Sequence, residues 1–99
     1  MQKLQLYEDI FDALANGKQT TIRKGKINIK LGELLFESSE LKRQKTVNVH
    51  KVYHCLLAEV SLTDLINDGF KDHKDLSKKM ERFYPDITLE SEVTVIKFS

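Results

Sequence analysis

Residues 17–23 read Gly17-Lys18-Gln19-Thr20-Thr21-Ile22-Arg23 and mark the point where a predicted helix gives way to a predicted strand. Upstream, four apolar residues have the i, i+3, i+4, i+7 spacing of an amphipathic helix: Tyr7, Ile10, Phe11 and Leu14. A glycine such as Gly17 suits the left-handed residue that closes such a helix. We therefore expect the chain to leave a helix at Gly17 and to become extended at Thr20.

The predicted strand carries a candidate site. Because successive strand side chains point to opposite faces, Thr21 and Arg23 share one face while Ile22 can anchor the core on the other. Lys18, three residues before Thr21, can reach the same opening. Arg23 offers a fork of donors for a phosphate, a carboxylate or a base edge. A partly desolvated Lys18 beside Arg23 would have a lowered pKa and could act as a general base toward the Thr21 hydroxyl.

The rest of the chain is mostly strand in its middle and at its end. Ile27, Ile29 and Leu31 alternate with polar residues, Gly32 precedes a short strand over 34–36, and residues 37–44 form a polar loop. The longest predicted strand covers 46–57, with a bulge at His50-Lys51 where the apolar alternation changes parity.

Two short helices and a final strand complete the pattern. Ser61 and Asp72 are predicted N-caps, Gly69 ends the first helix, and the second helix continues through Phe83 and Tyr84 to Pro85. Residues 93–98 are apolar enough for a strand flanked by others. This order predicts an α+β fold, a curved antiparallel β-barrel with flanking helices.

The composition favours one domain over residues 1–99, with 40% hydrophobic residues and a net charge of +1. That balance argues against a disordered tail or a strongly electrostatic nucleic-acid binder. Residues 13–32 nevertheless contain no Asp or Glu but five cations: Lys18, Arg23, Lys24, Lys26 and Lys30. Such a run is either a solvated basic face or an edge that binds anions.

We expect a cytoplasmic protein without metal or cofactor. Cys55 is the only cysteine, the first five residues lack an apolar signal core, and no apolar run approaches the ~20 residues that cross a bilayer. His50 and His54 with Cys55 do not supply the three or four convergent ligands of a zinc site. The sequence leaves the oligomeric state open between a monomer and a weak homodimer.

Four segments, in order, resemble ASCH domains, a branch of the PUA-like barrels. The string over 17–23 resembles the family's G-x-K-T-x-T-I-R-like motif, and 29–35 its hydrophobic-Gly-acidic stretch. Asp68-Gly69-Phe70 resembles its acidic-Gly-Phe segment, and 83–85 with 93–98 its closing helix and strand. The resemblance covers the chain from about Tyr7 onward and implies a PUA-like barrel with a cleft for RNA or a modified nucleoside.

The chain resembles in particular the short bacterial members that include N4-acetylcytidine amidohydrolases. The resemblance places their catalytic Lys at Lys18 and their nucleophilic Thr at Thr21. Their Glu falls at Gly69, which leaves Asp68, or more distantly Glu59, as the replacement carboxylate. The ligand-binding residues expected beside them are Arg23, Lys24, Phe70 and Tyr84.

Three functions remain open from the sequence. The domain binds RNA or a modified nucleoside without chemistry, with bases stacked on Tyr53, Phe70 or Tyr84. Alternatively, it is an amidohydrolase that uses Thr21 as nucleophile, Lys18 as base and Asp68 as the carboxylate. Third, it is an interaction domain with no ligand of its own, in which case protein side chains would fill the space around Lys18, Thr21 and Arg23.

Overall fold

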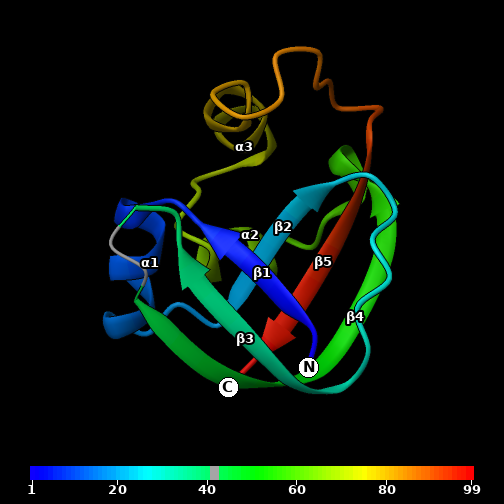
Figure 1. The fold of residues 1–99 in the computed structure, drawn as a ribbon. Helices are drawn as coiled ribbons and strands as arrows, with labels where there is room; N and C mark the ends of the chain where they lie inside the picture. Colours follow the sequence, from blue (N-terminus) through cyan, green and yellow to red (C-terminus); the bar gives the residue numbers. More distant parts are fainter. Residues whose placement is uncertain (41–42) are drawn as a thin grey trace.

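The computed structural model describes residues 1–40 and 43–99, which form one curled sheet with helices on both of its faces (Figure 1). The elements in chain order are β1 (Lys3–Leu6), α1 (Glu8–Ala15), β2 (Thr20–Lys24), β3 (Gly32–Ser38), β4 (Gln44–Leu56), the 3-10 helix η1 (Leu57–Glu59), α2 (Leu62–Asn67), α3 (His73–Met80) and β5 (Glu92–Phe98). The strands of these described ranges are ordered β1-β3-β4-β5-β2 across the sheet.

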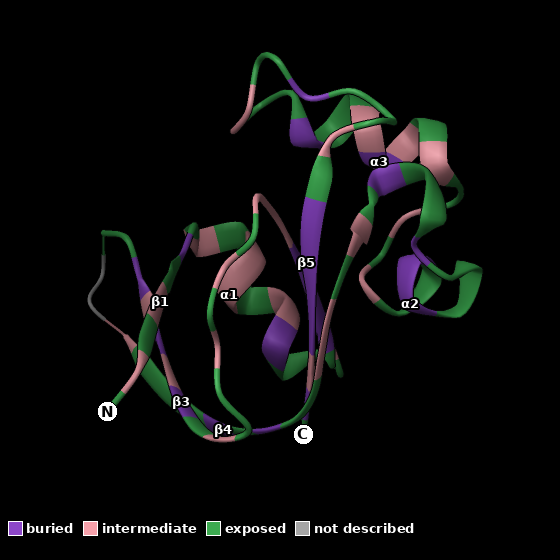
Figure 2. Cartoon of the chain, turned by 90° about the vertical axis from the view of Figure 1, so that its right-hand side faces the viewer, coloured by how far each residue is buried: buried purple, intermediate pink, exposed green. Residues whose placement is uncertain are grey.

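Two apolar cores lie on opposite faces of this sheet. Figure 2 shows α1 on one side of β5, and α2 and α3 on the other. β5 is buried on both faces, because Ile96 packs with Leu14 of α1 while Val95 packs with Leu65 of α2. The apolar sequence of β5 therefore reflects a strand between two neighbours and two cores.

The sequence correctly predicts the main elements around the site. The helix before Gly17, the strand from Thr20 and the final strand are all present. The register of β4 against β5 shifts between Val49 and Lys51, where the bulge is expected. The Ser61 hydroxyl accepts a hydrogen bond from the Asp64 N–H, and the Asp72 carboxylate accepts one from the Asp75 N–H, so both predicted N-caps are confirmed.

Other boundaries differ from the prediction. The prediction of a polar loop over 37–44 is wrong at both ends, because Glu37 pairs with Gln44 in the β3–β4 ladder. Residues 41 and 42, within this range, lie outside the described residues. Residues 27–31 are not a strand, since side chains satisfy their backbone: the Ile27 N–H donates to the Thr94 hydroxyl, and the Lys30 N–H to the Gln2 side chain. Helix α3 ends at Met80, before the predicted Phe83 and Tyr84.

The sheet is mixed, which corrects the expectation of a wholly antiparallel barrel. β1, which the sequence analysis did not identify, pairs in parallel with β3. β1 and β2 are thus the two end strands, and Arg23 Nη2 donates a 2.6 Å hydrogen bond to the Gln5 carbonyl. The sheet therefore curls into a half-barrel whose two ends meet at Arg23.

None of the helices in the described ranges has the length and apolarity needed to cross a membrane.

Candidate functional site

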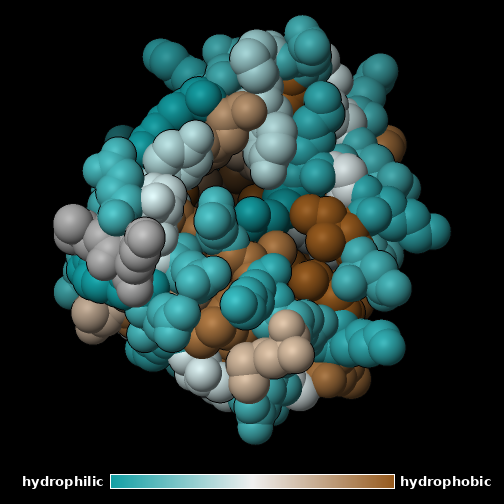
Figure 3. Space-filling view, viewed as in Figure 1, coloured by the Kyte–Doolittle hydropathy of each residue, from teal (hydrophilic) through white to brown (hydrophobic). Residues whose placement is uncertain are grey.

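A cleft of about 570 Å³ lies at the meeting point of the two end strands. Its walls come from β1, the start of α1, β2, the end of α2, and the segment from α3 to Tyr84. Figure 3 shows a hollow on this face between the end of β1 and α3. Six of the predicted site residues line it: Lys18, Thr21, Arg23, Asp68, Phe70 and Tyr84.

The end of α1 aims Lys18 into this cleft. Gly17 has a φ of +93°, its N–H donates to the Leu14 carbonyl, and the Lys18 N–H donates to the Ala13 carbonyl. These two bonds make a Schellman motif, in which a left-handed residue reverses the chain at a helix end. The helix-closing role predicted for Gly17 is confirmed, and Lys18 is the first residue after the reversal.

The end of α2 repeats the same motif on the opposite wall. Gly69 has a φ of +92°, its N–H donates to the Ile66 carbonyl, and the Phe70 N–H donates to the Leu65 carbonyl. A Cβ at position 69 would meet open space, but a glutamate there would be strained by this positive φ. The helix end instead presents Asp68, at the C-cap, and Phe70.

The two helix ends bring Lys18 and Asp68 into an ion pair. Lys18 Nζ contacts Asp68 Oδ1, and only 10% and 4% of the two side chains are exposed. Burial, together with the nearby Arg23 charge, lowers the pKa of Lys18 from 10.5 to about 8. Lys18 therefore stays mainly an ammonium at neutral pH, while a minor neutral population is available as a base.

β2 supplies the remaining polar groups of the cleft. Thr21 and Arg23 line the cleft, and Ile22 packs in the core with Leu57 and Leu65 while also bordering the cleft. Burial lowers the pKa of Arg23, and the electrostatic effect of the nearby Tyr84 opposes this shift. Arg23 nevertheless remains a cation at any physiological pH. Its bond to the Gln5 carbonyl uses one donor of the fork and leaves other donors for a ligand.

Three of the candidate side chains lie elsewhere. Lys24 does not line the cleft, although it follows Arg23 on β2. Glu59 and Tyr53 line a separate, smaller hollow. The Glu59 carboxylate accepts a 2.8 Å hydrogen bond from the Leu56 N–H, so Asp68 is the carboxylate beside Lys18.

A buried network holds α2 in place. The Tyr53 hydroxyl donates a 2.5 Å hydrogen bond to Asp64 Oδ2, and Lys97 Nζ lies 3.0 Å from Asp64 Oδ1. Burial alone would raise the pKa of Asp64, but these two partners lower it below its usual value. Because Asp64 and Asp68 lie at opposite ends of α2, this network fixes the helix that presents Asp68.

Much of the cleft rim was not predicted from the sequence. Tyr7, Asp9, Lys78, Lys79 and Arg82 also line it. With Lys18, Arg23 and Asp68, the cleft is lined by five cations and two carboxylates. This local excess of positive charge is not visible in the net charge of +1 for the whole chain. No signal in the local sequence links residue 9 to residue 82, because the fold alone brings them together.

No group of three His, Cys, Asp or Glu side chains that could hold a metal ion occurs in residues 1–40 and 43–99. His54 Nδ1 instead lies 2.9 Å from the Thr94 hydroxyl, and His73 Nε2 lies 2.7 Å from the Val60 carbonyl.

No protein-family model and no curated protein matches the sequence, but two solved structures match the fold. One is a point mutant of the ZmASCH protein from Zymomonas mobilis, with a TM-score of 0.67 and 13% identity over 97% of this chain and 66% of that one. The other is the ASCH domain from Lactobacillus crispatus JV V101, with a TM-score of 0.61 and 13% identity over 99% of this chain and 79% of that one. The chain spans just under two thirds of the Zymomonas chain. The chain has the fold of these two ASCH structures, so the predicted α+β curved barrel with flanking helices is confirmed, except that β1 pairs in parallel with β3.

Proposed function

We propose that this ASCH-fold domain binds a nucleoside, free or as part of an RNA strand, in the cleft around Lys18, Thr21 and Arg23. The observation that carries the proposal is the lining of the cleft, where aromatic rings stand beside an excess of cations. Bases stack on aromatic rings, and phosphates pair with arginine and lysine, so this combination fits the two halves of a nucleotide.

The size and polar groups of the cleft support the proposal. A volume of about 570 Å³ lies within the roughly 300–1,000 Å³ range of small-molecule sites. Phe70 and Tyr84 are only partly buried and pack against the core, so packing holds both rings in place where they line the cleft. The Thr21 hydroxyl can donate and accept, while the Arg23 fork can read a base edge or a carbonyl. An unfilled cleft of this kind argues against an interaction domain without a ligand.

The proposal is tested by equilibrium binding of cytidine, N4-acetylcytidine and a short single-stranded RNA. Arg23→Gln should weaken binding about tenfold or more, because a charged hydrogen-bond donor is lost from the cleft. Lys24→Gln is the matched control, since Lys24 neighbours Arg23 on β2 but does not line the cleft. RNA affinity should fall as salt rises, and nucleoside affinity should change little. If none of the three ligands binds at low salt, the proposal fails.

A second candidate function is hydrolysis of the acetyl amide of N4-acetylcytidine. The observation that favours it is the buried Lys18–Asp68 pair in the same cleft as Thr21, with a Lys18 pKa of about 8. Neutral Lys18 would take the proton of the Thr21 hydroxyl as its oxygen attacks the acetyl carbon. The proton then passes to the leaving cytidine nitrogen, and water hydrolyses the acetyl-Thr21 ester to acetate. Asp68 would hold Lys18 in position and stabilise its ammonium form.

The proposal also includes the cellular location and the oligomeric state of the protein. A cytoplasmic location is supported by Cys55 being the only cysteine, because such a chain needs no oxidising compartment to fold. A monomer or weak homodimer suffices, since one chain supplies every wall of the cleft.

A further inference from the structure

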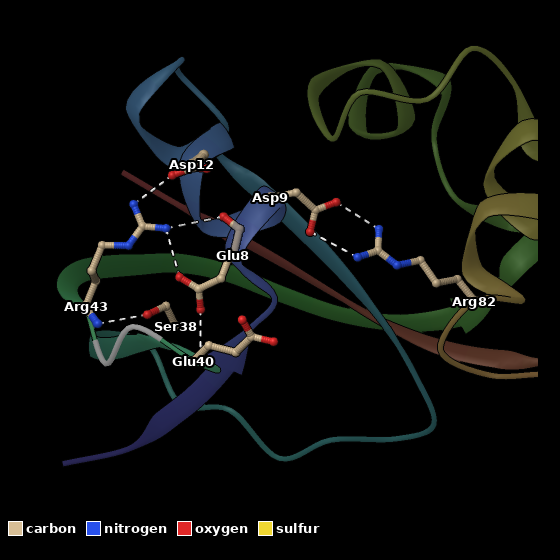
Figure 4. Close-up of polar contacts among 7 residues, drawn as sticks. All are labelled: Glu8, Asp9, Asp12, Ser38, Glu40, Arg43 and Arg82. Atoms are coloured by element: carbon tan, nitrogen blue, oxygen red, sulfur yellow. Dashed lines mark hydrogen bonds and ion pairs between the residues drawn. The ribbon is translucent and has the colours of Figure 1, made fainter.

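The rim of the cleft carries an arginine whose fork is already occupied by a carboxylate. Arg82 Nη1 lies 2.8 Å from Asp9 Oδ2, and Arg82 Nη2 lies 3.1 Å from Asp9 Oδ1. Figure 4 shows the two parallel contacts between α1 and the segment after α3. This bidentate geometry is the one that arginine uses for phosphate as well as for carboxylate. Asp9 therefore occupies a position that a phosphate could take.

Two aromatic rings hold this guanidinium in place. Arg82 Cζ lies 5.2 Å from the ring centre of Tyr7 and 4.8 Å from that of Phe83. The two rings stack on each other, with centroids 4.8 Å apart and planes 27° apart. Cation–π contacts favour one position of the fork, so less freedom is lost when an anion binds it.

The Asp9 carboxylate is open to exchange. Its side chain is 59% exposed and that of Arg82 is 53% exposed, so water screens their attraction. Lys78 also lines the cleft, one helical turn before Arg82, and pairs with no carboxylate in the described part of the chain. Lys79 lines it too but is partly neutralised by Asp75, 3.3 Å away. A doubly charged phosphate could contact both Arg82 and Lys78. The carboxylate of Asp9, in contrast, pairs with Arg82 and not with Lys78.

We propose that Arg82 and Lys78 form a phosphate subsite at the cleft rim, which Asp9 occupies when no ligand is bound. The inference rests on the proposed nucleoside site and narrows its ligand to a phosphorylated one, a nucleotide. The phosphate belongs either to a mononucleotide or to an RNA strand whose neighbouring phosphodiester reaches the rim. In both cases Asp9 gives way to the phosphate, and Tyr7 and Phe83 keep the guanidinium in position.

The test compares the affinities of cytidine, cytidine 5′- and 3′-monophosphate, a short RNA and inorganic phosphate in the same buffer. The unmodified protein should bind one of the phosphorylated nucleosides about tenfold more tightly than cytidine. Asp9→Asn should strengthen the binding of the phosphorylated ligands severalfold relative to that of cytidine, because it removes the competing anion. Arg82→Gln should reduce nucleotide affinity to that of cytidine, and Arg82→Lys should restore it only in part, because lysine lacks the fork.

The control is the neighbouring ion pair of the same helix. Asp12 lies 2.7 Å from Arg43 and is 60% exposed, but neither residue lines the cleft (Figure 4). Asp12→Asn should therefore leave every affinity unchanged. A preference for RNA over both mononucleotides assigns the phosphate to a strand, and the reverse assigns it to a mononucleotide.

The outcomes separate this inference from the proposed function. If cytidine binds but phosphate adds nothing, and Asp9→Asn acts like Asp12→Asn, the Asp9–Arg82 pair only fastens α1 to the segment after α3 and the subsite is refuted. If cytidine does not bind but inorganic phosphate does, in an Arg82-dependent way, the subsite stands and the nucleoside site falls. If nothing binds, both are overturned.

Discussion

Asp68→Ala should lower the free energy of unfolding by about 1–3 kcal/mol, because it removes a buried hydrogen-bond acceptor and leaves the Lys18 ammonium without its partner. The Lys18 ammonium would lose its carboxylate while remaining nine-tenths buried beside Arg23. It could then stay charged without a partner or release its proton. Either choice costs free energy in the folded state alone, so chemical denaturation at pH 7 should show the full effect.

The size of this loss depends on pH in a definite direction. The pKa of Lys18 is about 8 in the folded chain and about 10.5 in an unfolded one. Between these values the unfolded chain binds more protons, so stability rises with pH. The deficit of Asp68→Ala should be greatest well below pH 8 and should shrink as pH rises through about 8, because above that pH the folded lysine is neutral and needs no partner.

The double variant Lys18→Met/Asp68→Leu is the control for a specific charge effect. It removes both charges and keeps the volume, so it should recover most of the lost stability. It should not recover ligand binding, because the cleft has lost its ammonium. An Asp68→Ala variant as stable as the unmodified protein at pH 7 would show that the two side chains do not share a buried pair.

Thr21→Ala should reduce turnover of N4-acetylcytidine by about a thousandfold or more if the domain is an amidohydrolase, since nucleophile and base act as one unit. Thr21→Ser keeps a hydroxyl and should retain measurable activity. Turnover should rise as pH increases through about 8, because the base form of Lys18 is the neutral amine. Chromatographic measurement of the released acetate and cytidine tests the two Thr21 variants and the pH dependence.

The same titration separates the two candidate functions. As a binding residue, Lys18 acts through its positive charge, so affinity for a nucleotide should fall above pH 8 while hydrolysis would rise. Acetylcytidine that stays intact at pH 9 with stoichiometric protein contradicts the amidohydrolase. Acetylcytidine that is bound but not cleaved supports the binding domain.

The local parts of the site were predictable from sequence. Gly17 and Gly69 mark helix ends, and a left-handed glycine at such an end fixes the direction of the next residue. Alternation along β2 places Thr21 and Arg23 on one face, and both line the cleft, whereas Lys24, which was predicted to bind the ligand, does not. These features depend on neighbouring residues only, so short patterns contain them.

The long-range parts were not predictable in this way. β1 has four residues and pairs in parallel with β3, more than 25 positions away, so its sequence carries little strand signal of its own. Asp9 and Arg82 are 73 residues apart and meet only because the sheet curls. The spacing of Phe83 predicts that it belongs to the helix of α3. In the structure Phe83 lies beyond the end of that helix, where its ring stacks on Tyr7. Tertiary contacts decide such cases.

The most direct test of the cleft assignment is backbone amide NMR of the ¹⁵N-labelled protein during titration with cytidine 5′-monophosphate. The account predicts concentration-dependent shifts at Gln5, Thr21, Arg23, Phe70 and Tyr84, which come together only at this cleft. The amides around the Tyr53–Asp64–Lys97 network should stay unchanged. Saturable shifts confined to that second hollow, or no shifts at millimolar ligand, would contradict it.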